Sequence, residues 1–128
     1  MSQLSNYLEN ELCDHMLGVG SFTMPATVYL ACYTSNPADD NSGTEVSGSG
    51  YARQAITFGA ASGGASLNTS AETFTASGGN FGTITHIGIL DASTAGNLLV
   101  YGALTASKTV NDGESITFAV GSISVTLA

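Results

Sequence analysis

The sequence predicts an all-β fold, an antiparallel β-sandwich or jelly-roll-like barrel, with one short N-terminal α-helix. After Pro25 the chain is a succession of short apolar or alternating segments separated by turn residues, which is the pattern of sandwiches and jelly rolls. Before Pro25, a single segment has helical periodicity. The chain has 128 residues, 43% of them hydrophobic, so we expect residues 1–128 to form one domain with a buried core.

The helix is expected over residues 5–17. Ser5 or Asn6 can cap its amino end, because a short polar side chain there can accept a free backbone N–H. An apolar stripe on one face must be covered, either by the end of the sheet or by a neighbouring subunit, which makes Leu8 and Leu12 candidate interface residues. The apolar residues of this stripe recur every four positions: Leu4, Leu8, Leu12 and Met16.

The strands follow in order. Residues 27–34 are apolar on both faces, as is typical of a central strand. Residues 51–58 alternate, and residues 67–74 are more polar and suit an edge. An Asn-Asp-Gly turn is expected to join the third and fourth of the remaining strand segments, because these residues favour tight turns. Those segments are 81–90, 97–104, 108–110, 115–120 and 122–127.

Arg53 is the only arginine of the chain and the main candidate for a functional side chain. Its fixed donors suit a bidentate carboxylate partner, and Glu45 and Glu72 are the candidates, within the chain or across a subunit interface. Tyr51 beside it would add a flat contact surface of the type enriched at interfaces. Residues 35–50 form a loop longer than packing requires, which makes it a natural contact element.

Catalytic and metal chemistry are not indicated, so we expect no enzyme, no catalytic residue, no metal and no cofactor. His86 has no suitably spaced acid, and no serine lies in a nucleophile elbow. The acidic residues of 39–45 do not have the spacing of a calcium-binding loop. Cys13 and Cys32 are expected to be buried thiols, with one disulfide left open as an alternative.

The charge balance excludes several kinds of partner. The net charge is −8, with ten acidic residues against Arg53 and Lys108. Such a chain cannot build the basic surface that nucleic acids or anionic membranes require. No apolar run approaches the roughly 20 residues of a membrane span, and no secretion signal precedes the helix, so synthesis in a cytoplasm without classical export is expected. Only 9% of residues are charged, against about 25% in a typical domain, which favours an assembled component.

Five sequence blocks, spanning nearly the whole chain, resemble a family of small virion structural proteins of tailed bacteriophages. Members of this family are variously labelled tail fibre proteins, structural proteins or head decoration (cement) proteins. The resemblance implies a virion component, and it brings no catalytic residue with it. The blocks, in order, are YLENELCDHMLG, MPATVYLACYTSNP, GTEVSGSGYARQAITFGAASGG, FGTITHIGILDASTAGNLLVYGAL and SKTVNDGESITFAVGSISVTL.

The resemblance gives two hypotheses for the position on the virion. The first is a head decoration protein that binds and stabilises the capsid shell as a trimer. Its helix or its loop 35–50 would then meet the major capsid protein. The alternative is a tail, collar or fibre-associated subunit that contributes to host attachment, in which exposed tyrosines such as Tyr33 or Tyr101 could bind a cell-surface sugar. In both cases the expected partners are further copies of the chain and other virion proteins.

Overall fold

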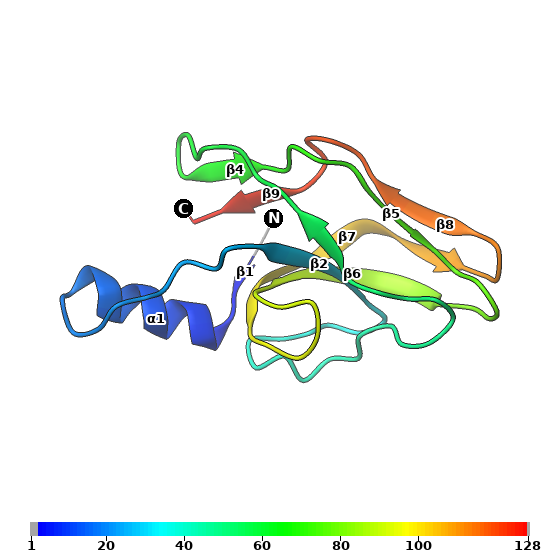
Figure 1. Ribbon diagram of the computed structural model, residues 1–128, viewed down its shortest axis with the longest axis horizontal. Coiled ribbons are helices and arrows are strands. Elements are labelled where there is room, and N and C mark those ends of the chain that lie inside the picture. The colour runs from blue at the N-terminus through cyan, green and yellow to red at the C-terminus, as the bar shows by residue number, and fades with distance from the viewer. Residues whose placement is uncertain (1–2, 128) are drawn as a thin grey trace.

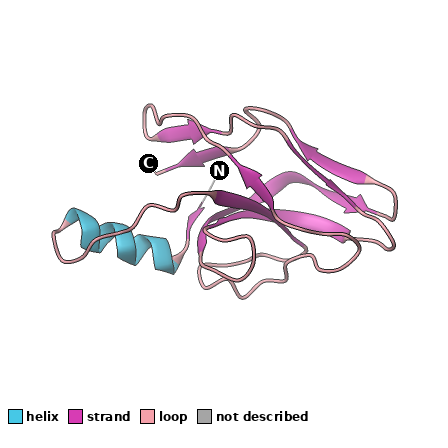
Figure 2. Ribbon diagram, in the orientation of Figure 1, coloured by secondary structure: helices cyan, strands magenta, loops and turns pink. Residues whose placement is uncertain are grey.

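The structure is a computed structural model, and it describes residues 3–127. It confirms an all-β protein with antiparallel sheets and one short N-terminal helix (Figures 1 and 2). The elements in chain order are β1 (Gln3–Leu4), α1 (Asn6–Met16), β2 (Val28–Tyr33), β3 (Gln54–Ile56), β4 (Ala65–Leu67), β5 (Glu72–Thr75), β6 (Gly82–Leu90), β7 (Leu98–Val110), β8 (Ser115–Phe118) and β9 (Ser124–Thr126).

The first layer is a five-stranded antiparallel sheet with the order β1-β7-β6-β2-β3. β2 lies between β6 and β3, as its two apolar faces predict. Leu30 and Cys32 point into one hydrophobic core, whereas Ala31 and Tyr33 point into a second core on the opposite face. Of the strand predicted over 51–58, only the three residues of β3 pair in the sheet.

The second layer is an interrupted two-stranded ribbon, in which β4 pairs with β9 and β5 pairs with β8 (Figure 1). The interruption is at Asn68, whose side chain is 1% exposed. Its Nδ2 donates to the carbonyls of Ser70 at 2.8 Å and Ala119 at 3.0 Å, and its Oδ1 accepts from the backbone N–H of Ile123 at 2.9 Å. The single strand predicted over 67–74 is therefore wrong, because Asn68 replaces the ladder with side-chain hydrogen bonds.

β7 is one long strand, although the sequence predicts two, over 97–104 and 108–110. Residues 104–107 lie opposite Thr85 alone, so the strand makes a wide bulge and then returns to β6. The turn at 111–113 joins β7 to β8 as expected. The two strands do not pair with each other, however, because β8 crosses to the ribbon and pairs with β5.

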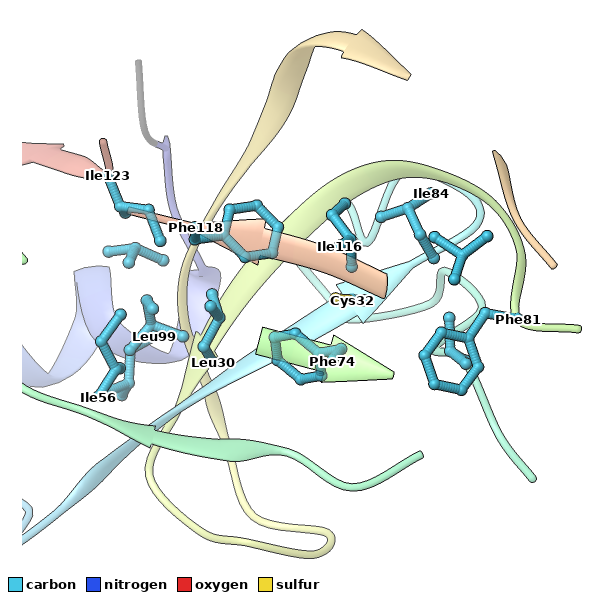
Figure 3. Close-up of a cluster of buried hydrophobic side chains, with 14 of the residues drawn as sticks. Leu30, Cys32, Ile56, Phe74, Phe81, Ile84, Leu99, Ile116, Phe118 and Ile123 are labelled. Carbon is cyan, nitrogen blue, oxygen red and sulfur yellow. The ribbon is translucent and has the colours of Figure 1, made fainter. Parts of the chain in front are cut away.

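The inner core fills the space between the sheet and the ribbon (Figure 3). Aromatic rings lie at its centre: Phe74 stacks on Tyr51 with ring centroids 5.8 Å apart and meets Phe118 edge-on at 6.1 Å. Burial of each such side chain contributes about 1.5–3 kcal/mol to folding. Side chains from both layers make up the labelled cluster: Leu30, Cys32, Ile56, Phe74, Phe81, Ile84, Leu99, Ile116, Phe118 and Ile123.

The outer core lies on the other face of the sheet and is covered by loops instead of strands. Its centre needs Gly88, because a Cβ there would lie 2.8 Å from Leu98 Cδ1 and 3.0 Å from Tyr33 Cε1. The covering segments are residues 35–45 and 91–97, which we call the outer loops. The buried residues of this core are Ala31, Tyr33, Leu90, Leu98 and Tyr101.

Helix α1 begins at a serine cap and packs on the body through its first half. The Ser5 hydroxyl accepts the N–H of Leu8 at 3.2 Å and donates to the carbonyl of Leu98. Leu8 is buried in the inner core and Leu12 packs against it, so these two predicted interface residues serve the fold of their own chain. No helix among residues 3–127 is long and apolar enough to cross a membrane.

The second half of the helix projects beyond the body (Figure 1). Every residue from Cys13 to Ser21 is exposed. The expectation that Cys13 is buried is therefore wrong, because no residue among 3–127 covers that side of the helix. Cys32 is buried, and both thiols are free.

We predict that Asn68→Ala lowers the free energy of unfolding by about 2–3 kcal/mol, because buried backbone groups of both ribbon halves lose their partners. Chemical denaturation of the purified protein measures this. Asn10→Ala, at an exposed helix position, is the matched control and should change stability by less than about 0.5 kcal/mol. An Asn68→Ala protein as stable as the control would contradict the role assigned to this side chain.

Candidate functional site

Arg53 lies just before β3 and is largely buried, with 9% of its side chain exposed. Its Nε donates to Glu45 Oε2 at 2.9 Å, and its Nη2 donates to Glu45 Oε1 at 2.8 Å, which is a bidentate ion pair. Its Nη1 donates to the carbonyls of Ala92 and Ala95, each at 2.8 Å. Glu45 is thus the partner of Arg53, and the bond is within one chain.

These contacts join three segments that lie far apart in the sequence. Glu45 belongs to the first outer loop, the two carbonyls belong to the second, and Arg53 leads into the sheet. The hydrogen bonds to the Glu45 carboxylate raise the pKa of Arg53 further, so the guanidinium stays charged. The arginine therefore fixes both outer loops to the sheet over the outer core.

Tyr51 completes this arrangement, which we call the Arg53 cluster. Its hydroxyl donates to Glu45 Oε2 at 2.7 Å and accepts the N–H of Cys32 at 3.0 Å. Burial and the bond to Glu45 raise the pKa of Tyr51 far above its ordinary value. Its ring stacks on Phe74 inside the inner core. The expectation that Tyr51 offers a flat contact surface is therefore wrong, because the ring is used within the fold.

Glu72, the other predicted partner of Arg53, lies in the ribbon. Its Oε2 accepts the Ser70 hydroxyl at 2.8 Å, beside the interruption at Asn68. The sequence alone could not decide which glutamate pairs with Arg53. Glu45 precedes the arginine and Glu72 follows it, and a loop could bring either one into contact with it. The two backbone carbonyls of the second outer loop could not be predicted as partners of Arg53, because a backbone carbonyl is present in every residue and gives no sequence pattern.

Tyr33 and Tyr101 are buried, with 1% and 5% of their surface exposed. Their hydroxyls donate to Asn41 and Asp39 of the first outer loop. Burial raises the pKa of Tyr33 to about 12, and the hydrogen bond to Asp39 raises that of Tyr101 to about 12. The expectation that these two rings could bind a sugar is wrong, because the outer loop covers them.

A polar hollow of about 290 Å³ lies between the start of α1 and the outer loops. Tyr7, Asp39, Asp40 and Asn97 are among its lining residues. Carboxylate and amide groups of this kind accept hydrogen bonds from hydroxyl-rich or cationic groups. Among residues 3–127, no group of three or more histidine, cysteine, aspartate and glutamate side chains is placed to hold a metal ion.

His86 lies on β6, and its Nδ1 shares a hydrogen bond of 2.8 Å with the hydroxyl of its neighbour Thr85. Lys108, the second cation of the chain, is exposed and donates to the carbonyl of Ser115 at 2.7 Å. The polar side chains singled out by the sequence therefore bond mainly to other parts of the same fold.

The protein is thus a small β-protein in which a buried polar network holds two loops in position. Comparison with known families identifies the class to which it belongs. The model of one family, described as "Podophage GP4 fiber I protein gp80", matches residues 3–126. The protein is a structural protein of the bacteriophage virion, as the sequence resemblance predicts. The chain belongs to the podophage GP4 fiber I protein gp80 family. No curated protein matches the sequence.

We predict that Arg53→Ala lowers the free energy of unfolding by about 2–4 kcal/mol, because it leaves the Glu45 carboxylate and two carbonyls without their donor. Arg53→Lys should recover only part of this loss, since lysine cannot form the bidentate pair. Denaturant titration provides the measurement. Lys108→Ala removes the other cation and should change stability by less than about 0.5 kcal/mol. Equal effects of Arg53→Ala and Lys108→Ala would rule out the proposed role.

Alkaline pH should destabilise the protein through the outer-core tyrosines. Their pKa is 10.0 in an unfolded chain and about 12 in the fold, so between these values the unfolded chain ionises first. The free energy of unfolding should therefore fall as the pH rises from 10 to 12. A series of denaturant titrations measures this slope. Tyr33→Phe should make it shallower, and an unchanged slope in that variant would contradict the assignment.

Proposed function

We propose that this protein is a subunit of a podophage tail fibre, or is associated with one, and contributes to attachment of the virion to its host. The observation that carries this proposal is the match to a fibre protein family over residues 3–126. It reverses the order of the two hypotheses drawn from the sequence, in which head decoration came first. Head decoration by a trimer on the major capsid protein has no comparable support.

The structure supports a function in assembly and binding rather than in catalysis. Arg53, the main candidate from the sequence for a functional side chain, donates its hydrogen bonds to Glu45 and to two backbone carbonyls. His86 bonds to the hydroxyl of Thr85, and no carboxylate of residues 3–127 forms an ion pair with it. We therefore propose a protein that acts through its surfaces, which the buried polar network holds in shape.

The proposed partners are further copies of this chain and other proteins of the tail. A net charge of −8 argues against nucleic acid and anionic membranes, because Arg53 is ion-paired and Lys108 is one isolated exposed cation. The proposed location is the assembled virion, after synthesis in the host cytoplasm. Arg53 holds the outer loops, which line the hollow beside them, in place through its hydrogen bonds.

The position on the virion is tested by counting and by deletion. Quantitative mass spectrometry of purified virions should find on the order of tens of copies, as tail symmetry allows, and not the hundreds of a capsid coat. Virions lacking the protein should keep the heat resistance of the wild type and adsorb poorly to host cells. A copy number in the hundreds, with loss of heat resistance and normal adsorption, would establish head decoration instead.

A further inference from the structure

The polar hollow between the start of α1 and the outer loops has the size of a small binding site. Its volume is about 290 Å³, close to the lower end of the roughly 300–1,000 Å³ that ligand pockets occupy. Three segments that lie far apart in the sequence line it: the start of the helix, the first outer loop and the second outer loop. They contribute three amides, two carboxylates and one phenol, from Asn6, Asn41, Asn97, Asp39, Asp40 and Tyr7.

Two of these side chains are held in place by the outer core. Tyr101 donates its hydroxyl to Asp39 Oδ1, and Tyr33 donates its hydroxyl to Asn41 Oδ1, the latter at 2.9 Å. Both tyrosines are buried, so the carboxylate and the amide that they contact are fixed in orientation. A ligand that binds such side chains loses little free energy to ordering them, because they are already ordered.

Two more side chains of the hollow are held within the loops. Asp40 Oδ1 accepts the N–H of Ser42 at 3.1 Å, and Asn97 Nδ2 donates to Asp91 Oδ2 at 3.1 Å. The loops themselves are fixed by the hydrogen bonds of Arg53. The polar network of the outer half of the structure therefore determines the arrangement of groups in this hollow.

Several polar atoms of these side chains remain available to a ligand. Within residues 3–127, Asp39 Oδ2 and Asn97 Oδ1 accept no hydrogen bond. In the same part of the chain, Asn41 Nδ2 donates none, and the side-chain amide of Asn6 forms none at all. The hollow therefore offers free acceptors and free donors together, beside the exposed carboxylate of Asp40.

This mixture of donors and acceptors distinguishes between classes of ligand. The carboxylates of Asp39 and Asp40 repel an anion. A cationic group needs acceptors alone and would leave the amide donors unused. Hydroxyl groups match the mixture, because each one both donates and accepts. Adjacent hydroxyls of a sugar can thus donate to a carboxylate and accept from an amide, and the bond to the ionised acceptor is about twice as strong as a neutral one.

We propose that the polar hollow binds one neutral sugar unit of a carbohydrate. Its hydroxyls donate to Asp39 and Asn97 and accept from the amides of Asn6 and Asn41. Tyr7, which packs against the inner core and lines the hollow, adds aromatic surface. The inference rests on the proposed function and deepens it, since it names the class of host-surface molecule that a fibre-associated subunit would contact.

Titration of the purified full chain with single sugars tests binding, with amide chemical shifts as the readout. The probes are the methyl glycosides of glucose, galactose, mannose, rhamnose and N-acetylglucosamine, and methylammonium chloride serves as the cationic probe. At least one glycoside should shift the amides of residues 6–7, 39–41 and 96–98 and leave those of the distant turn 111–113 unchanged. Shifts with methylammonium alone, or with none of the probes, would overturn the proposal.

A double variant tests whether the free atoms of the hollow make the contact. Asn6→Ala combined with Asn97→Ala removes a free donor and a free acceptor, and should weaken the dissociation constant by at least about tenfold. Both residues are exposed and the Ser5 cap remains, so the variant should unfold at the wild-type temperature. Asn10→Ala, exposed on the same helix but outside the hollow, is the matched control and should bind as the wild type does. Equal affinities of variant and control would contradict the assignment.

Virions that carry the double variant connect sugar binding to attachment. They should contain the wild-type number of copies and adsorb poorly, whereas virions with Asn10→Ala should adsorb normally. If deletion of the protein impairs adsorption but the double variant does not, the hollow is not the contact and the attachment function still stands. If the purified protein binds sugar but virions without it adsorb normally, the proposed function fails and the site itself does not.

Discussion

The ion pair between Arg53 and Glu45 is the interaction on which the outer half of the structure depends. The outer core has no second sheet to cover it, and two loops do so instead. Loops carry little packing of their own, so their position must be fixed by directed bonds. Arg53 supplies them, because one guanidinium can reach a carboxylate and two carbonyls at once. Tyr51 connects this network to the aromatic centre of the inner core.

The molecule therefore divides into a body and a projecting arm, residues 6–25, which comprise α1 and the segment that returns towards β2 (Figure 1). In the body, the polar groups that interrupt regular structure are paired, and Asn68 in the ribbon is the clearest case. The arm differs from the body, because large apolar side chains in its far half are exposed to solvent. The body therefore holds its loops in fixed positions, whereas the far half of the arm leaves large apolar side chains exposed.

Much of the fold could be predicted from the sequence, and the failures have physical causes. β2 and α1 were predictable because their apolar residues follow the strand and helix periods over most of their length. The interruption at Asn68 was not, because an asparagine in a polar segment gives no sign of a buried side chain. β1 is two residues long and shows no period. The pairing of β8 with β5 was not predictable either. It depends on which layer the chain joins after the turn at 111–113, and no residue near that turn indicates this. For the site, charge scarcity pointed to Arg53 and Glu45, whereas the carbonyl partners and the burial of Tyr33 and Tyr101 required the tertiary structure.

Amide hydrogen exchange of the Arg53→Lys variant tests the central claim most directly. The N–H of Gly43 bonds within the first outer loop, and that of Asp91 bonds within the second. If Arg53 fixes both loops, these two amides should lose protection together. The amides of Asn68 and Phe81 bond within the ribbon and within the sheet, respectively, and should exchange as in the wild type. Unchanged protection in both loops, or loss in only one of them, would contradict the account.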